Sequence, residues 1–383
     1  MQYRKFGKLD WNVSVLGFGC MRLPVLGGDF ANINEPEAIK MIRYAIDQGV
    51  NYVDTAYPYH RGNSEIVTGK ALQNGYREKV KLATKLPIWM VKEADDFDKC
   101  LNEQLGKLQT DYIDFYLFHG IDKQKWENVI QKFDLLAKAE AAKKDGRIKY
   151  IGFSFHDKFD SFKQIIDGYD KWDFCQIQFN YMGIEFQAGE KGLKYAASKG
   201  IPVVVMEPLL GGKLANMPEP ILDILRSNGI ERSPVDLALQ WLWNKPEVTV
   251  VLSGMSSMEQ VKENLASAGK AEINSISDAE LKTVDLVREA YLQRILISCT
   301  KCGYCMPCPN GVDIPGCFDL YNNGYMYNNA AISRNIYTMW FPEPKRASAC
   351  IQCKECEKKC PQSIAISEWM LKVQDVLGNG KEY

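Results

Sequence analysis

Short apolar segments alternate with longer segments of helical spacing between residues 10 and 270. The short segments are almost continuously apolar, which is typical of parallel strands that are covered on both faces. The pattern therefore predicts eight strands, at Val13–Gly17, Asn51–Asp54, Val80–Lys85, Tyr112–Leu117, Tyr150–Ser154, Phe174–Phe179, Ile201–Met206 and Val248–Ser253.

The segments between these strands carry signals for the start and end of helices. Asn34 is a candidate N-cap with Pro36 in the first turn, and Gly49 is the candidate stop. Ser233-Pro234 predicts a second helix start, and Ser257 with Gln260 has the spacing of a capping box. Apolar residues at helical spacing in the first helix are Ile39, Ile42 and Ile46, and residues 3–11 predict a small hairpin.

Eight strand–helix units predict an α/β fold of the (β/α)8 TIM-barrel type. A doubly wound open sheet is the main alternative, but no Gly-x-Gly-x-x-Gly fingerprint follows an early strand. A helix over residues 278–297 leads out of the barrel, and the composition then changes to Cys, Pro, Asn and Tyr. We therefore predict a barrel over 1–280 and a smaller, mainly helical, ferredoxin-like iron–sulfur domain over 281–383.

Nine of the twelve cysteines follow residue 298. The second run has the Cys-x2-Cys-x2-Cys-x3-Cys-Pro spacing of bacterial ferredoxins, in which the fourth cysteine binds the neighbouring cluster. The first run is one residue shorter before its last cysteine, and Cys317 is an additional thiol. Structural zinc is the alternative, although it more often uses two separated pairs. We predict two 4Fe–4S clusters, one on Cys299, Cys302, Cys305 and Cys360, the other on Cys350, Cys353, Cys356 and Cys308.

The formal net charge of −1 gives no reason to expect nucleic acid or an anionic membrane as a partner. No apolar run approaches the length of a membrane span, and the N-terminal segment lacks the apolar core of a signal peptide. Disulfides would suit a small secreted domain, but this is a long chain without an export signal, so its clustered thiols indicate metal binding in a reducing compartment. We expect a cytoplasmic protein.

Polar side chains follow three consecutive predicted strands, where a barrel places its chemistry. Asp54 ends the second strand, with Tyr59 five residues on, Lys85 ends the third, and His119 follows the fourth. A nearby ammonium is expected to lower the pKa of a tyrosine, while a carboxylate holds the lysine and a histidine orients a carbonyl. Each residue alone would more often be structural, but the four together predict an acid–base site. A metal hydrolase is disfavoured, because the three histidines lack ligand spacing.

These four residues resemble, in order and position, the catalytic tetrad of the aldo-keto reductases. The resemblance covers residues 1–270, including Glu65 and the segment 16–21, and the cysteine segment 299–309 resembles the branch with a C-terminal ferredoxin-type domain. The family implies a nicotinamide cofactor that lies across the barrel mouth. By position, its contacts would be Gly19, Cys20, Met21, Ser154, Gln176, Met206, Gly211, Gly212, Lys213, Ser253, Glu263 and Asn264.

Some positions depart from the family pattern. Phe155 stands where many relatives have Asn, and Met206 where many have an aromatic ring. NADPH-preferring members have basic or hydroxyl side chains for the 2′-phosphate at positions that are Gly254, Met255 and Gln260 in this chain. The absence of a positively charged side chain for the 2′-phosphate favours NADH over NADPH. The same departures leave a flavin as an alternative cofactor.

The expected activity is reversible NAD(P)H-dependent reduction of a small-molecule aldehyde, ketone or sugar, with Tyr59 as the general acid. A hydride carries two electrons, whereas a 4Fe–4S cluster carries one. A second hypothesis is therefore an electron-transfer enzyme, whose clusters connect the barrel site to a ferredoxin or another redox protein. A third is that the clusters are structural or oxygen-sensing.

Overall fold

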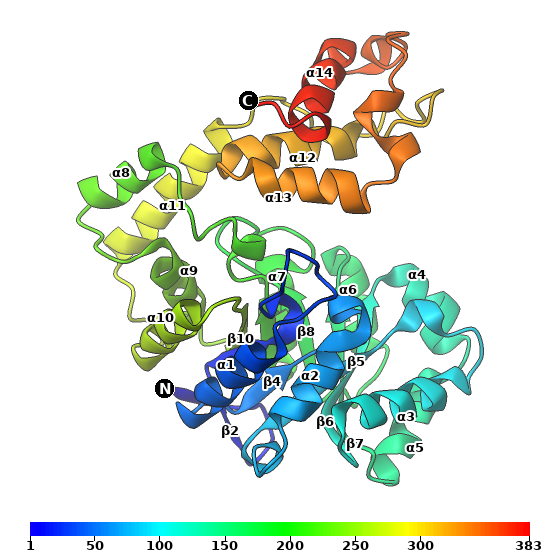
Figure 1. The fold of residues 1–383 in the computed structure, drawn as a ribbon, viewed down its shortest axis with the longest axis vertical. Helices are drawn as coiled ribbons and strands as arrows, with labels where there is room; N and C mark the ends of the chain where they lie inside the picture. The colour runs from blue at the N-terminus through cyan, green and yellow to red at the C-terminus, as the bar shows by residue number, and fades with distance from the viewer. The chain divides into compact units, whose positions relative to one another are not determined.

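The computed structural model describes residues 1–383 and divides them into two compact units (Figure 1). The first unit contains residues 1–211 and 235–277, and the second contains residues 212–234 and 278–383. The division after residue 277 lies close to the boundary that the composition indicates. The second unit also takes residues 212–234, which the sequence analysis had assigned to the barrel.

The first unit is a closed barrel of eight parallel strands in the order β10-β3-β4-β5-β6-β7-β8-β9. Each of the eight predicted segments overlaps one of these strands, so the predicted (β/α)8 barrel is confirmed and the open sheet is excluded. The strands are β3 Leu16–Gly19, β4 Tyr52–Asp54, β5 Lys81–Leu86, β6 Ile113–Ile121, β7 Ile148–Phe155, β8 Phe174–Gln178, β9 Val203–Met206 and β10 Val248–Gly254.

The first predicted strand was wrong in its bounds, because one apolar run serves two elements. Residues 12–14 form β2 (Asn12–Ser14), which pairs antiparallel with β1 (Tyr3–Lys5), and the barrel strand begins only at Leu16. The hairpin carries the fully buried Phe6, whose ring packs against Phe115 and Phe174 near the beginnings of their strands. It therefore closes the barrel at the amino ends of the strands, which leaves the carboxyl ends as the open mouth.

Helices follow the strands and cover the outside of the barrel (Figure 1). The side chain of Asn34 makes no cap bond, contrary to prediction, whereas Ser257 accepts a hydrogen bond from the Gln260 amide as expected. The helices that lie in or begin at the edge of this unit are α1 Glu35–Asp47, α2 Asn63–Ala71, α3 Asp96–Leu108, α4 Lys123–Lys125, α5 Leu135–Lys144, α6 Phe159–Asp167, α7 Gly189–Ser198, α9 Pro234–Trp243 and α10 Met258–Gly269.

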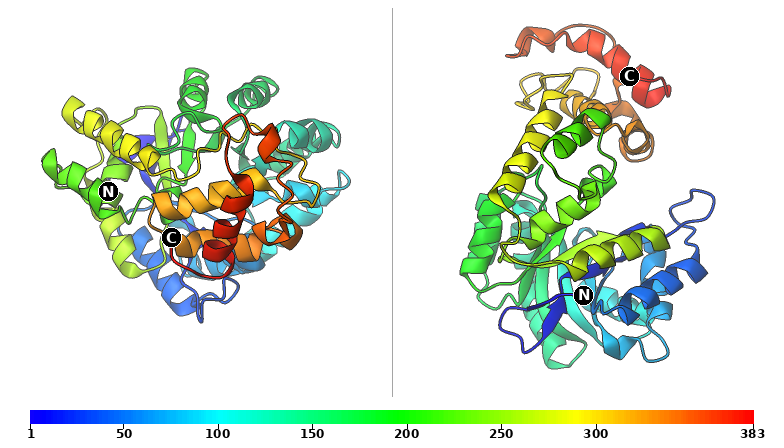
Figure 2. Two further views of the ribbon diagram at one scale, coloured as in Figure 1. Left: turned by 90° about the horizontal axis from the view of Figure 1, so that it is seen from above. Right: turned by 90° about the vertical axis from the view of Figure 1, so that its left-hand side faces the viewer.

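The second unit is mainly helical and has an apolar core of its own, with Phe318, Tyr337 and Met370 among its buried side chains. Helices α12 and α13 run side by side within it (Figures 1 and 2). No helix of the chain is long and apolar enough to cross a bilayer. The helices of this unit are α8 Glu219–Ser227, α11 Asp278–Gln293, α12 Ile314–Met326, α13 Ala330–Asn335 and α14 Ile366–Val373.

Candidate active site and candidate cluster sites

Lys85, near the end of β5, is the centre of the candidate active site. Its ammonium lies 2.7 Å and 2.9 Å from the two carboxylate oxygens of Asp54, at the end of β4, and 2.8 Å from the carbonyl oxygen of Thr55. The Tyr59 hydroxyl is 3.4 Å away on its other side. Lys85 and Asp54 are almost fully buried, so both charges have little water and depend on each other.

Tyr59 opens a short 3-10 turn, Tyr59–Gly62, between β4 and α2. The next residue, His60, is fully buried and has a left-handed backbone with φ of 51°. Its Nδ1 lies 2.7 Å from the carbonyl oxygen of Phe30, and the amide of Leu23 donates to its Nε2 at 3.2 Å. These bonds hold a backbone conformation that costs about 1–3 kcal/mol. His60 was not a predicted site residue, and no local motif would have identified its role as an anchor of this turn.

His119 lies within β6, with its ring edge-on to that of Tyr59 at 6.1 Å between centroids. Trp89, which is half exposed, lies 5.2 Å from the same ring. The Nδ1 atom of His119 is buried and has no hydrogen-bond partner. The structure thus brings the four predicted catalytic residues together at the carboxyl ends of β4, β5 and β6.

Burial controls the protonation of the side chains at this candidate active site. It lowers the pKa of His119 well below its usual value, assisted by the charge of Lys85, so the imidazole is neutral. Burial is the largest single effect on the pKa of Lys85 and acts to lower it, but Asp54 and Tyr59 together outweigh it and the net pKa is raised. Burial raises the pKa of Tyr59 despite the opposing effect of Lys85. The expectation that the pKa of Tyr59 is lowered was therefore wrong, and the hydroxyl keeps its proton.

Two predicted cofactor contacts lie beside this cluster, on β7 and β8. The hydroxyl of Ser154 accepts a hydrogen bond from the Gly120 amide at 2.7 Å, and its own proton remains available. The side-chain Nε2 of Gln176 points to the sulfur of Met206, while its Oε1 is buried without any partner. A carboxamide offers both donors and an acceptor, so a nicotinamide amide fits these unsatisfied atoms.

Arg22, which the sequence analysis did not single out, lies beside two of the predicted cofactor loops. A Cβ built on Gly254 would lie 2.8 Å from its side-chain Cγ, and one on Gly211 would lie 3.8 Å from its Nη2. The side chain is exposed and forms no ion pair. One basic residue shortly after a strand carries no distinctive pattern, so only the fold shows its position between the two glycines.

The remaining predicted cofactor residues are distributed over both units. Asn264 donates to the Ser253 hydroxyl at 2.9 Å, and both side chains are buried, whereas Glu263 is exposed. Gly19 ends β3, Cys20 is fully buried and Met21 is exposed. Gly212 and Lys213 belong to the second unit, where Lys213 lies 3.2 Å from the side-chain oxygen of Asn323 and over the ring of Tyr327.

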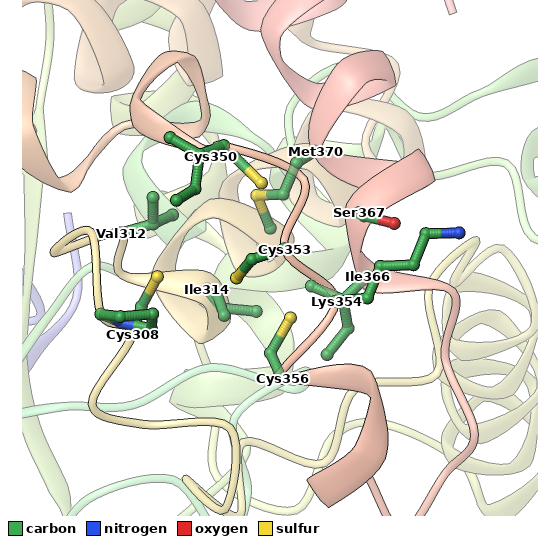
Figure 3. Close-up of a pocket in the computed structure, with 12 residues that line it drawn as sticks. Cys308, Val312, Ile314, Cys350, Cys353, Lys354, Cys356, Ile366, Ser367 and Met370 are labelled. Atoms are coloured by element: carbon green, nitrogen blue, oxygen red, sulfur yellow. The ribbon is translucent and has the colours of Figure 1, made fainter.

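The eight predicted cluster ligands line two cavities in the second unit. Each cavity takes three cysteines from one run and the last cysteine from the other run. In one of them the four sulfur atoms turn toward one another (Figure 3). Four thiols around a mainly apolar cavity are the donor set of a 4Fe–4S cluster, so the residues present fit that group. The first cavity is lined by Cys299, Cys302, Cys305 and Cys360, the second by Cys308, Cys350, Cys353 and Cys356.

Cys317 lines neither cavity. It lies on α12, fully buried, with its sulfur 3.6 Å from the carbonyl oxygen of Lys345. Burial raises the pKa of its thiol to about 12, so it stays protonated. In contrast, Cys308 is grouped with Cys350 in spite of the short spacer before it.

Comparison with known proteins agrees with this geometry. Residues 15–289 match the model of the aldo/keto reductase family, and residues 298–365 match that of the 4Fe-4S dicluster domain. L-galactose dehydrogenase of Arabidopsis thaliana is 28% identical over 313 residues, covering 76% of this chain and 95% of the relative. The NADH-specific methylglyoxal reductase of Escherichia coli is 27% identical over 335 residues, covering 74% and 97%.

Solved structures give the same result for the barrel. The holo form of an aldo-keto reductase from Bacillus halodurans superposes with a TM-score of 0.61 at 28% identity, covering 75% of this chain and 96% of that one. The chain belongs to the aldo/keto reductase family and carries a C-terminal 4Fe–4S domain. It is an oxidoreductase.

Proposed function

We propose that this protein catalyses the reversible reduction of a small-molecule carbonyl to an alcohol, with NADH as the favoured cofactor. The observation that supports this most strongly is the buried ammonium of Lys85, which joins Asp54 to the hydroxyl of Tyr59 beside a neutral His119. Such a cluster can hold, release and recover one proton at the Tyr59 oxygen.

A bound nicotinamide would supply the hydride, with Ser154 and Gln176 holding its carboxamide. The Tyr59 hydroxyl donates its proton to the carbonyl oxygen, and the ammonium of Lys85 stabilises the phenolate that remains. Asp54 keeps that ammonium in place. His119, being neutral, can donate one hydrogen bond that aligns the carbonyl without competing as an acid. The direct test is NADH oxidation by the full-length protein in the presence of aldehydes, ketones and sugars, and failure with every class would reject the proposal.

Arg22 is expected to bind the cofactor phosphates. We assign it to the pyrophosphate, because its guanidinium lies beside Gly211 while its carbon chain lies beside Gly254, and glycines allow the closest approach of a phosphate. Met255 is fully buried and the Gln260 Oε1 already accepts from the Ser256 amide, so no side chain at those positions selects for the 2′-phosphate.

The Arg22→Leu variant should therefore bind NADH and NADPH about 10- to 150-fold more weakly, by a similar factor for each, since one charge-assisted contact is worth about 1.5–3 kcal/mol. Fluorescence titration of the protein with each dinucleotide measures this. The Arg61→Leu variant, which removes another basic residue near the mouth, is the control and should bind both normally. A loss confined to NADPH would place Arg22 at the 2′-phosphate instead.

A second candidate function is electron transfer between the barrel and a redox protein through two 4Fe–4S clusters. We propose that the two cysteine sets described above bind these clusters. The side chains of Cys302 and Cys353, one in each cavity, are exposed, so both clusters would reach the protein surface. A ferredoxin could exchange electrons there. Cluster ligation needs thiols that are not oxidised to disulfides, which favours a reducing compartment such as the cytoplasm.

Adding NADH alone to the anaerobic protein distinguishes carbonyl reduction from electron transfer through the clusters. If the barrel site exchanges electrons with the clusters, the visible absorbance of the clusters should bleach without any carbonyl present. The Tyr59→Phe variant should bleach equally, because only the proton donor is lost. If NADH is oxidised by carbonyls while the clusters never bleach, the clusters do not take part in this chemistry.

A further inference from the structure

The two cysteine runs place different side chains at matching backbone positions. Lys301 and Gln352 each occupy the residue before the second cysteine, with φ of 56° and 60°. Gly303 and Lys354 each follow the second cysteine, with φ of 79° and 60°. Because the backbone is alike at these positions, they allow the side chains that the two runs place there to be compared directly.

The first cavity receives no charge or side-chain donor from these positions. The ammonium of Lys301 pairs with Asp319 at 2.7 Å, and Gly303 has no side chain. No side chain donates a hydrogen bond to the four thiols, and the wall includes the apolar Phe318 and Ile364.

The second cavity receives a side-chain donor. The side-chain amide of Gln352 lies 3.6 Å from the sulfur of Cys350 and donates to the carbonyl oxygen of Ser367 at 3.0 Å. Ser367 is buried, so this second bond holds the amide in place. Lys354 lines the cavity with its carbon chain, and its ammonium points away from the four sulfur atoms (Figure 3).

Reduction adds a negative charge to a 4Fe–4S cluster, so hydrogen bonds to its sulfurs and nearby positive charge raise its potential. We propose that the cluster bound by Cys308, Cys350, Cys353 and Cys356 has the higher reduction potential, and that Gln352 is the positioning residue that sets it. The inference rests on the two clusters proposed above. Ile314 and Ile366 line both cavities, so the two clusters are neighbours. An electron would therefore pass from the cluster of lower potential to the cluster of higher potential.

The test is an anaerobic redox titration of the full-length holoprotein, followed by electron paramagnetic resonance. Two clusters should reduce at separate potentials. The Gln352→Leu variant should lower the higher one, shifting the equilibrium between the clusters about tenfold, which is about 60 mV for one electron. The Lys301→Leu variant, at the matching position of the first run, should leave the higher potential unchanged. The Cys353→Ser variant alters the signal of the same cluster and so assigns it.

An unchanged higher potential in Gln352→Leu, or a shift of the lower one, would overturn the inference. If Gln352→Leu does not assemble, Gln352→Ala removes the same donor with a smaller side chain and should also lower the higher potential. Iron and sulfide analysis keeps the two proposals apart. Fewer than two 4Fe–4S clusters in the wild type would reject the cluster assignment itself, whereas two clusters with unaltered potentials would reject only the role of Gln352.

Discussion

The Tyr59→Phe variant should lose carbonyl reduction by about 10²- to 10⁴-fold in kcat, the usual contribution of a positioned general acid. The phenyl ring keeps the packing against His119, and Lys85 keeps its bonds to Asp54 and the Thr55 carbonyl, so the fold should be intact. Steady-state rates and the affinity for NADH, both measured under anaerobic conditions, separate lost chemistry from lost binding. The affinity should not change.

Tyr57 supplies a matched control in the same loop. Its hydroxyl lies 3.1 Å from the carboxylate of Glu103 on α3, and its ring lies under the ammonium of Lys107. The Tyr57→Phe variant should therefore keep nearly full activity. Normal turnover in Tyr59→Phe, or a comparable loss in Tyr57→Phe, would contradict the assignment of the acid.

The assignment of Tyr59 as the general acid also predicts how the rate of carbonyl reduction by the wild type depends on pH. Reduction needs Tyr59 protonated, and burial raises its pKa, so the rate should stay constant up to at least pH 10, the usual pKa of a tyrosine. The pKa of His119 is well below its usual value, so no decline from its protonation is expected near pH 6.5.

The barrel and the grouping of the four candidate catalytic side chains could be predicted because both depend on short-range patterns. Strands that are covered on both faces are continuous apolar runs, and the residue that ends such a run must lie at the mouth. The bounds of the first strand could not be read in this way, because the apolar run around Val13 serves the hairpin as well as the barrel.

The features that were missed depend on three-dimensional neighbours. Arg22 gains its proposed role only from two glycines about 190 and 230 residues away along the chain. The direction of the pKa shift of Tyr59 depends on how deeply the side chain is buried, which a motif does not record. The allocation of residues 212–234 to the second unit depends on the packing of α8 against α11.

The Lys85→Met variant should be inactive and also destabilised by about 3–5 kcal/mol, the cost of leaving one member of a buried ion pair without its partner. Asp54 would remain buried with no ammonium at 2.7 Å. Without Lys85, burial alone raises its pKa above the unfolded value of about 3.9. A raised pKa gives stability that is present at low pH and lost as pH rises through it, so the penalty should shrink as the pH falls from neutrality toward the unfolded pKa.

Chemical denaturation of the barrel, followed by tryptophan fluorescence, measures this penalty. The Asp54→Asn and Lys85→Met double variant should recover most of the stability, since the unpaired charge is gone, but none of the activity. The Lys107→Met variant removes an ion pair of equal length, 2.7 Å to Glu103, from a more exposed position and should cost about 1 kcal/mol or less. If the double variant is no more stable than Lys85→Met alone, the penalty does not come from the buried carboxylate, and Lys85 stabilises the barrel through its other contacts.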